Sequence, residues 1–232
     1  MEGILIVLPI YNEVENIRNV YNRIRKNSNA DILFVDDGST DGSINLVSDL
    51  ILADSRIKLI LRGSKLGLGS AYRDSYKFAL ENNYSFLIQC DADGSHEIEK
   101  IPEMMHAAAS GADLVIGSRY VSGGSVKGWA NSRLVISRIG NLYSRLMLGL
   151  TSKDNTAGFR IYNLETLAKL NYESAKANGY AFQVQMTYLF RTKKIVEIPI
   201  CFVERQYGAS KMTIKIALEA LIQIPLLRFA KD

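Results

Sequence analysis

Short apolar runs alternate with amphipathic segments through the first half of the chain. The apolar runs predict five strands, at residues 4–8, 32–35, 57–61, 86–89 and 113–117. Between them, apolar side chains recur at helical spacing, which predicts helices over residues 16–26, from Ser39 or Thr40 to 51, over 70–81 and over 99–110. This alternation is typical of an α/β protein with a doubly wound, mostly parallel sheet.

The last segment has an amphipathic pattern of its own. From Thr213 to Phe229, apolar side chains fall on one side of a helix and polar ones on another, and Pro225 ends or kinks it. Such a helix either packs on the core or lies in a membrane interface. We therefore expect a main domain over residues 1–211 and an amphipathic helix within 212–232.

The composition limits the classes of protein to which this chain can belong. The 232 residues are 47% hydrophobic and 22% charged, as in ordinary globular domains. Cys90 and Cys201 are the only cysteines, which favours buried thiols in a reducing compartment over a disulfide. Neither a signal peptide nor an uncharged stretch of about 18 residues is apparent, so we expect neither secretion nor a transmembrane helix.

The net charge of +4 conceals an asymmetry between the two halves of the chain. Residues 1–117 carry 11 Lys/Arg and 17 Asp/Glu, whereas residues 118–232 carry 17 Lys/Arg and 7 Asp/Glu. The acidic half suits a metal ion and a nucleotide. The basic half suits an anionic partner such as a phosphate, a nucleic acid or a membrane lipid, although part of it is simply solvated surface.

Polar residues follow each of the five predicted strands. In parallel sheets of this class, ligands bind beyond the carboxyl ends of the strands, so these residues should share one site. Asp91 and Asp93, one residue apart after the fourth strand, suit a divalent cation held against phosphates. The other polar segments are 9–13, 36–41, 62–71 and 117–120.

Ordinary structural roles compete for several of these residues. An Asp-x-Asp pair alone is often a solvated turn. Asp36 or Asp37 can close an Asx-turn, and Asn12 and Glu13 can start a helix by capping it and by favouring its dipole. Gly69 either lets the backbone approach a ligand or turns the chain into a helix.

Together with later motifs, these segments resemble the family 2 glycosyltransferases of the GT-A fold, and within them the dolichol-phosphate (polyprenyl-phosphate) mannose synthases. The resemblance extends from residue 4 to about residue 211, and its later motifs are specific to the polyprenyl-phosphate branch. The motifs that carry it are PIYNE at 9–13, VDDGSTDG at 35–42, DADGSH at 91–96, GSRY at 117–120, GW at 128–129, ISR at 136–138, DNTAGFR at 154–160, GYAFQ at 179–183 and RQYGASK at 205–211.

The resemblance implies a donor site, a metal site and a site for a lipid phosphate. The residues expected to bind the nucleotide-sugar donor are Pro9, Tyr11, Asn12, Glu13, Val35, Asp36, Asp37, Lys65, Gly69, Asp91, Ala92 and Gln183. Those expected to hold Mg²⁺ or Mn²⁺ are Asp91, Asp93 and Ser95. Those expected to bind the acceptor phosphate are Arg119, Arg133 and Ser137. Those expected to be catalytic are Asp93, Arg119, Arg205 and Lys211.

Two positions depart from the pattern of the resembled family. Ser95 stands where relatives often have a metal-binding Gln, and Gln185 stands where they usually have Glu. If residue 185 served as a general base, this chain would be impaired. A phosphate acceptor is already ionised near neutral pH, however, and needs no base.

The resemblance implies a metal-dependent, inverting transfer of mannose from GDP-mannose to dolichyl or polyprenyl phosphate, with GDP released. We expect a peripheral protein on the cytoplasmic face of the membrane, alone or with a transmembrane partner subunit, and no nucleic-acid partner. The alternatives are a UDP-glucose donor, a hydroxyl acceptor in a polysaccharide, and a binding or scaffold protein without activity. A nicotinamide dehydrogenase is disfavoured because no Gly-x-Gly-x-x-Gly follows the first strand.

Overall fold

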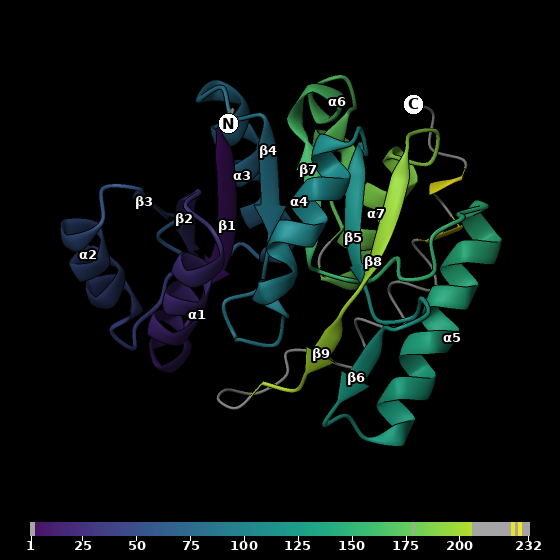
Figure 1. Cartoon of the computed structure of the whole chain (residues 1–232), viewed down its shortest axis with the longest axis horizontal. Helices are drawn as coiled ribbons and strands as arrows, with labels where there is room; N and C mark the ends of the chain where they lie inside the picture. Colours follow the sequence, from purple (N-terminus) through teal and green to yellow (C-terminus); the bar gives the residue numbers. More distant parts are fainter. Residues whose placement is uncertain (1–2, 178, 206–223, 226, 229–232) are drawn as a thin grey trace.

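The computed structural model describes residues 3–177, 179–205, 224–225 and 227–228, and a seven-stranded sheet forms its centre (Figure 1). The strands are β1 (Ile4–Ile10), β2 (Asp31–Asp36), β3 (Ile57–Leu61), β4 (Phe86–Gln89), β5 (Leu114–Ser118), β7 (Arg160–Asn163) and β8 (Ile195–Pro199). Their spatial order is β3-β2-β1-β4-β7-β5-β8, and only β7 runs antiparallel to its neighbours. The prediction of a doubly wound, mostly parallel sheet is therefore confirmed.

Helices cover both faces of the sheet. On one face lie α1 (Val14–Asn27), α2 (Ser43–Ala53) and α4 (Ile101–Ala109); on the other lie α3 (Leu68–Glu81), α6 (Leu164–Ala168) and α7 (Tyr180–Leu189). Short 3₁₀ turns span Ile98–Lys100 and Tyr172–Ser174. Along β1, Ile6 and Leu8 pack against the first group and Leu5 and Val7 against the second. Burial on both faces explains why this strand is a continuous apolar run.

Helix α1 is capped by Asp41, in the loop after β2, and not by Asn12. Asp41 Oδ2 accepts the first amide N–H of α1 at 3.0 Å. Asn12, with φ of +56°, instead joins the loops after β1 and β2, since its N–H donates to Ser39 Oγ at 2.9 Å and its Oδ1 accepts the Thr40 N–H at 2.8 Å. Asn12 is therefore not the cap of α1, and α2 begins at Ser43, later than the expected start at Ser39 or Thr40.

The longest of the described helices, α5 (Asn131–Leu148), lies beyond the β8 edge of the sheet (Figure 1). A second, two-stranded parallel sheet pairs β6 (Ser125–Lys127) with β9 (Cys201–Val203). In the part of the chain that the structure describes, no helix is long and apolar enough to cross a membrane. The expected domain boundary at 211 and most of the expected amphipathic helix lie outside the described residues. Among the four residues of that segment that the structure describes, Ile224 is the buried one, and it packs against Leu148 and Val184.

Candidate active site

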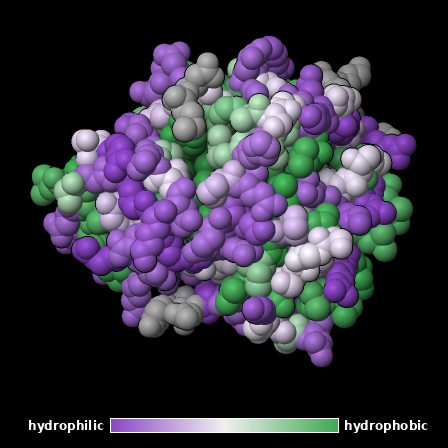
Figure 2. Space-filling model, in the orientation of Figure 1, coloured by the Kyte–Doolittle hydropathy of each residue, from purple (hydrophilic) through white to green (hydrophobic). Residues whose placement is uncertain are grey.

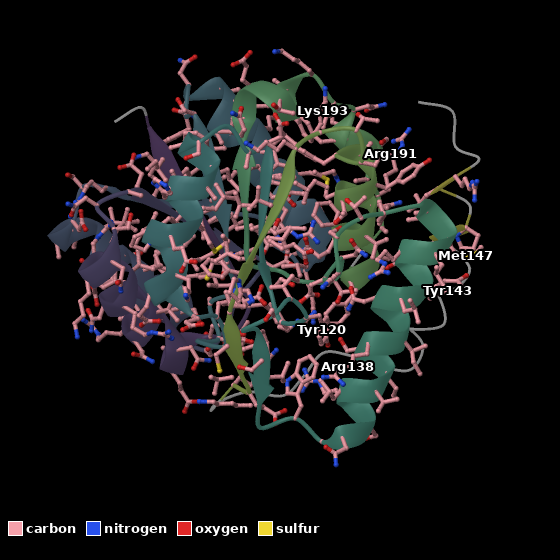
Figure 3. All side chains as sticks on the ribbon, turned by 45° about the vertical axis from the view of Figure 1, so that its right-hand side comes forward. Tyr120, Arg138, Tyr143, Met147, Arg191 and Lys193 are labelled. Carbon is pink, nitrogen blue, oxygen red and sulfur yellow. The ribbon has the colours of Figure 1, made fainter. Side chains whose placement is uncertain are left out.

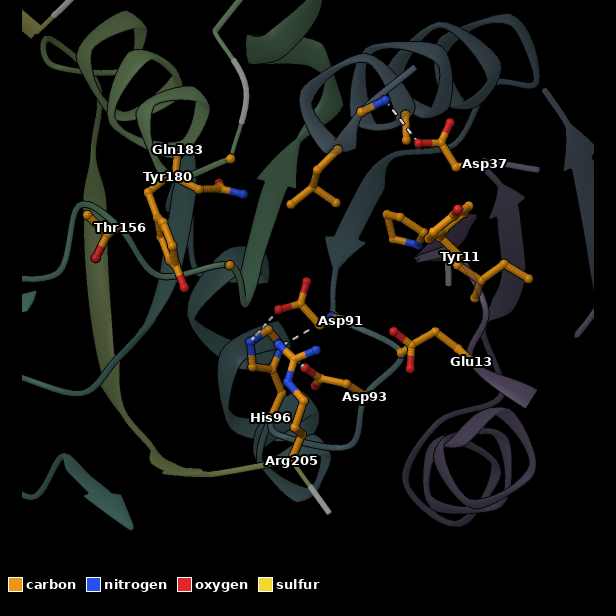
Figure 4. A pocket seen from close by; sticks show the side chains of 18 of the residues that line it. Tyr11, Glu13, Asp37, Asp91, Asp93, His96, Thr156, Tyr180, Gln183 and Arg205 are labelled. Atoms are coloured by element: carbon orange, nitrogen blue, oxygen red, sulfur yellow. Dashed lines mark hydrogen bonds and ion pairs between the residues drawn. The ribbon is translucent and has the colours of Figure 1, made fainter. Parts of the chain in front are cut away.

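A pocket lies at the carboxyl ends of β1, β2 and β4 (Figure 4). Most residues predicted from the sequence line it, namely Pro9, Tyr11, Glu13, Asp37, Lys65, Asp91, Ala92, Asp93, Arg119, Arg133, Gln183 and Arg205. The predicted residues that do not line it are Asn12, Val35, Asp36, Gly69, Ser95 and Ser137. Lys211 lies outside the described residues.

Asp36 and Asp37 are adjacent but have different surroundings. Asp36 is buried, and its carboxylate accepts the backbone N–H groups of Gly38 at 2.9 Å and Ser39 at 3.0 Å, which closes the turn after β2. Asp37 accepts the backbone N–H of Gly67 at 2.9 Å while facing the pocket. Asp36 is thus the residue of the Asx-turn, and Asp37 is the one placed to meet a ligand.

The loop from residue 62 to residue 67 forms one wall of the pocket beside the end of β1. Arg62 Nη1 donates to Asp37 Oδ1 at 2.8 Å and fixes the base of this loop. Lys65 Nζ lies 4.2 Å from the centre of the Tyr11 ring, and both side chains line the pocket. An aromatic face next to a cation suits a nucleotide base and its phosphates.

Gly69 and Val35 were expected to bind the donor, but neither lines the pocket. A Cβ atom at Gly69 would lie 2.5 Å from the carbonyl oxygen of Ala177 and 3.0 Å from the Phe182 ring, so glycine lets α3 pack closely against α7. The side chain of Val35 is fully buried in the core beneath α3. Neither residue lines the pocket, because each is packed against its neighbours.

Asp91 is held from two sides. Tyr72 Oη donates to its Oδ1 at 3.3 Å, and His96 Nε2 lies 3.5 Å from its Oδ2. His96 Nδ1 accepts the backbone N–H of Asp91 at 3.3 Å, which leaves Nε2 facing the carboxylate. Removal from bulk water raises the pKa of Asp91; His96 opposes this shift and the charge of Asp93 adds to it.

Asp93, the second carboxylate, lies between a loop amide and a cation. Its Oδ1 accepts the Ser95 N–H at 3.0 Å, and its Oδ2 lies 2.9 Å from Arg205 Nη2. The buried Ser95 Oγ has no hydrogen-bond partner among the described residues. Carboxylate and hydroxyl oxygens are ligands that Mg²⁺ and Mn²⁺ prefer, so Asp91, Asp93 and Ser95 fit the expected cation.

Within the described ranges, no group of three or more His, Cys, Asp or Glu side chains could hold a metal ion by itself. Mg²⁺ commonly keeps several waters and takes other ligands from phosphates, so two carboxylates are sufficient for this kind of site.

Arg119 is buried in an ion pair with Asp154. Its Nε donates to Oδ2 at 2.7 Å and its Nη2 donates to Oδ1 at 2.6 Å and to Thr156 Oγ1 at 2.9 Å. Burial lowers the pKa of Arg119, but Asp154 outweighs this effect and raises it above its usual value. Glu197 positions the partner, because its carboxylate accepts the backbone N–H groups of Lys153 at 2.8 Å and Asp154 at 3.0 Å.

Arg133 reaches the pocket from α5. Its guanidinium carbon lies 4.0 Å from the centre of the Trp129 ring, and its Nη1 donates to Glu204 Oε1 at 2.9 Å. Arg119 lies 5.4 Å from the same ring, so the only tryptophan contacts both arginines expected at the acceptor site. Ser137 does not join them, because its hydroxyl accepts the Tyr120 Oη at 2.7 Å outside the pocket.

Two amides on α7 have different environments. Gln183 is buried and lines the pocket, and its Oε1 has no hydrogen-bond partner among the described residues. Gln185 Oε1 accepts the backbone N–H of Ala177 at 2.9 Å, and Gln185 is not a lining residue. Gln185 therefore anchors the segment before α7, and its side chain is not positioned to act as a general base.

Some lining residues had no role in the sequence interpretation, among them His96, Thr156, Tyr180 and Phe202. Thr156 precedes β7, whose reversed direction brings its amino end to the edge where the parallel strands have their carboxyl ends. The motifs at 154–160 and 179–183 contain Thr156 and Tyr180 and could have pointed to them. The site was predicted from the carboxyl ends of parallel strands, however, and that argument could not place these two residues.

The fold and the pocket define the class of protein. The family model described as glycosyl transferase family 2 matches residues 5–170, so the chain belongs to this family and is a glycosyltransferase.

Two curated relatives are similar along nearly the whole chain. One is polyprenol monophosphomannose synthase of Mycolicibacterium smegmatis, 42% identical over 224 residues that cover 95% of this chain and 84% of the relative. The other is undecaprenyl-phosphate mannosyltransferase of Micrococcus luteus, 42% identical over 226 residues that cover 95% of this chain and 92% of the relative.

Solved structures share the fold. Glucosyl-3-phosphoglycerate synthase of Mycobacterium tuberculosis in complex with UDP aligns with a TM-score of 0.67 at 16% identity, covering 100% of this chain and 82% of that one. The same enzyme with Mn²⁺, UDP and glucosyl-3-phosphoglycerate aligns with a TM-score of 0.65 at 16% identity, covering 100% and 81%. The expected GT-A fold is thereby confirmed.

Proposed function

We propose that this glycosyltransferase moves mannose from GDP-mannose to a polyprenyl or dolichyl phosphate, giving polyprenyl-phosphate mannose and GDP. The names of the two relatives describe the joining of mannose to a polyprenyl phosphate, and both match 95% of the chain at 42% identity. The observation that carries the proposal is the convergence in one pocket of the carboxylates Asp91 and Asp93 with the arginines Arg119, Arg133 and Arg205. Arginine and metal-binding carboxylates suit two phosphate-bearing substrates.

The donor is assigned to the wall formed by the ends of β1 and β2. Asp37 and Tyr11 would contact the nucleoside, Lys65 the diphosphate, and the unpaired Oε1 of Gln183 the sugar. Mg²⁺ or Mn²⁺ on Asp91, Asp93 and Ser95 would neutralise charge on the departing diphosphate.

The proposed reaction is a single displacement. An oxygen of the lipid phosphate forms a bond to the anomeric carbon while the bond between that carbon and the GDP oxygen breaks, so the configuration inverts. Because the phosphate is already ionised, no side chain needs to remove a proton. This agrees with the position of Gln185, whose Oε1 accepts the backbone N–H of Ala177. Arg205, now 2.9 Å from Asp93, is close enough to stabilise the leaving diphosphate.

We place the enzyme on the cytoplasmic face of the membrane as a peripheral protein, alone or with a transmembrane partner subunit. The reason is chemical: a water-soluble nucleotide sugar and a lipid phosphate meet only at a membrane surface. The basic second half of the chain is consistent with an anionic surface.

The test is a donor-by-acceptor assay. Purified protein with Mg²⁺ or Mn²⁺ receives radiolabelled GDP-mannose or UDP-glucose and a short polyprenyl phosphate in detergent. Butanol-extractable label from GDP-mannose alone supports the proposal. Label from UDP-glucose alone would mean that the donor is UDP-glucose. The absence of lipid-linked label, in protein shown to bind GDP, would refute the assignment of a lipid phosphate as acceptor.

A variant pair tests the metal site. Asp93→Asn should abolish transfer and weaken Mn²⁺ binding measured by electron paramagnetic resonance in the presence of GDP. Asp49→Asn, on the exposed side of α2, makes the same chemical change away from the pocket and should alter neither. Equal Mn²⁺ binding in both variants would overturn the metal assignment.

A further inference from the structure

A second pocket adjoins the candidate active site at Arg119, which is the one described residue that lines both. It lies between the segment after β5 and helix α5. Arg138, Arg145 and Lys153 line it, and none of its described lining residues is an Asp or Glu. The pocket is therefore strongly cationic, and neither the fold nor the proposed transfer requires it to be.

These three cations differ from the arginines of the candidate active site. Each arginine there is paired with a carboxylate at 2.6–2.9 Å. Within the described part of the chain, Arg138, Arg145 and Lys153 have no such partner, although they share one pocket. Neighbouring like charges destabilise one another unless an anion compensates them, so this pocket is suited to an anionic ligand.

The side chains around the pocket are positioned by ordered neighbours. Arg138 lies 6.0 Å from the centre of the Tyr120 ring, and Figure 3 shows the two side chains together beside α5. Arg145 follows Arg138 by seven residues, or two helical turns, and so shares its side of α5. Lys153 extends from a backbone fixed by Glu197, which accepts its N–H at 2.8 Å. Two guanidinium groups and an ammonium group match the oxygens of a phosphate.

The border of the pocket is apolar. Leu142 lines the pocket and is 51% exposed, and Ile139 and Leu146, one turn away on either side, are 60% and 68% exposed. Figure 2 shows hydrophobic side chains at the surface along the right-hand edge, where Figure 1 places α5. A free phosphate ion would leave this row in water, whereas a lipid would cover it with hydrocarbon next to its phosphate.

We propose that the pocket formed by Arg138, Arg145 and Lys153 binds the headgroup phosphate of an anionic membrane phospholipid, at a site separate from the acceptor phosphate. This inference rests on the proposed function in one respect, which is that the acceptor of the transfer lies in a membrane. The pocket would hold α5, and with it Arg133, at the surface where that acceptor lies.

Vesicle flotation tests the proposal on the full chain. Wild-type protein should bind vesicles of phosphatidylglycerol and phosphatidylcholine, and should bind pure phosphatidylcholine poorly. The triple variant Arg138→Gln/Arg145→Gln/Lys153→Gln should bind the anionic vesicles about a hundredfold more weakly, the effect expected of three basic residues at such a surface. Glutamine is a good helix former, so α5 should persist, which circular dichroism would verify.

A matched control separates this pocket from overall charge. The variant Arg18→Gln/Lys26→Gln/Lys77→Gln removes the same number of charges from exposed positions on α1 and α3. It should bind anionic vesicles within a fewfold of wild type. An equal loss of binding in the two triple variants would overturn the proposal, because net charge would then explain both.

Two further measurements exclude neighbouring interpretations. Inorganic phosphate at matched ionic strength should not displace the protein from vesicles; displacement of wild type would assign the pocket to free phosphate instead. In neutral detergent with a short polyprenyl phosphate, the pocket variant should keep wild-type transfer, and a selective loss there would make the pocket part of the acceptor site. If wild type itself shows no transfer, the proposed function fails while the vesicle result still stands.

Discussion

The carboxylate of Asp154 accepts two hydrogen bonds from the guanidinium of Arg119 and a third, at 2.9 Å, from its backbone N–H. The Asp154 side chain is completely buried and that of Arg119 is 4% exposed. The direction of this guanidinium is therefore set before any ligand arrives. Arg119 contributes a positioned donor to the pocket, while its net charge is largely compensated.

Asp154→Asn should lower the free energy of unfolding by about 3 kcal/mol, because removal of one partner leaves a buried charge uncompensated. It should also raise the KM for the lipid acceptor more than that for the donor. Urea unfolding and steady-state kinetics measure the two effects, with the exposed Asp49→Asn as control. Unchanged stability would show that the pair is dispensable.

Gly69→Ala should destabilise the protein by about 1–3 kcal/mol, since the added Cβ would lie 2.5 Å from the carbonyl oxygen of Ala177. GDP affinity, measured by calorimetry, should fall as well, because this contact supports the pocket wall. Gly140→Ala is the matched control: a Cβ there meets nothing within 4 Å, and alanine in a helix interior should add about 0.5–1 kcal/mol. Effects of the same sign in both variants would contradict this interpretation.

Gln185→Glu should keep transfer activity within about threefold of wild type, because a carboxylate oxygen can accept the same Ala177 N–H. Gln185→Leu removes the acceptor, and it should lower both stability and donor affinity. Steady-state kinetics of the two variants distinguish an anchoring role from a catalytic one. A large gain in rate for Gln185→Glu would mean that a base is needed after all.

The stability of the protein should depend on the ionisation of Asp54. Burial raises the pKa of this carboxyl, but hydrogen bonds from Arg56 and Arg25 outweigh burial and lower it to about 2. The folded pKa is thus below the unfolded value of about 3.9, so the carboxylate stabilises the fold above about pH 4. This stabilisation is lost as the pH falls toward 2.

Asp54→Asn should therefore lower the free energy of unfolding by about 2 kcal/mol at pH 7. Urea unfolding at a series of pH values should show the difference from wild type shrinking below pH 4. A difference that stays constant over this range would mean that the hydrogen bonds do not require the charge.

Much of the fold could be predicted because β1, β2, β4 and β5 run in the same direction and are buried, which makes each a clear apolar run. Only β3, at the edge of the sheet, is half-exposed. β7 could not be predicted in the same way. It is four residues long and begins with Arg160, whose guanidinium is buried by donating to the backbone oxygens of Ala157, Asn155 and Gln183 at 2.7–3.0 Å. A hydropathy pattern cannot predict a central strand that begins with an arginine.

The candidate site was predictable where strand direction alone decides position, as for Asp91 and Asp93. It was not predictable where two neighbouring residues compete for the same turn. Asp36 and Asp37 are chemically identical, and only the loop path shows which carboxylate closes the turn and which faces the pocket. The surroundings of Ser137 could not be predicted for a related reason, since its Tyr120 partner lies 17 residues earlier in the chain, outside α5.

Strand β9 gives the two halves of the pocket a common support. Its Val203 N–H donates to the carbonyl of Ser95 at 3.1 Å, and the Glu204 N–H that follows donates to the carbonyl of Lys127 at 2.9 Å. The next residue, Arg205, meets Asp93, while Glu204 itself holds Arg133. Donor and acceptor affinities should therefore be thermodynamically coupled, and reciprocity requires each substrate to change the affinity of the other by the same factor.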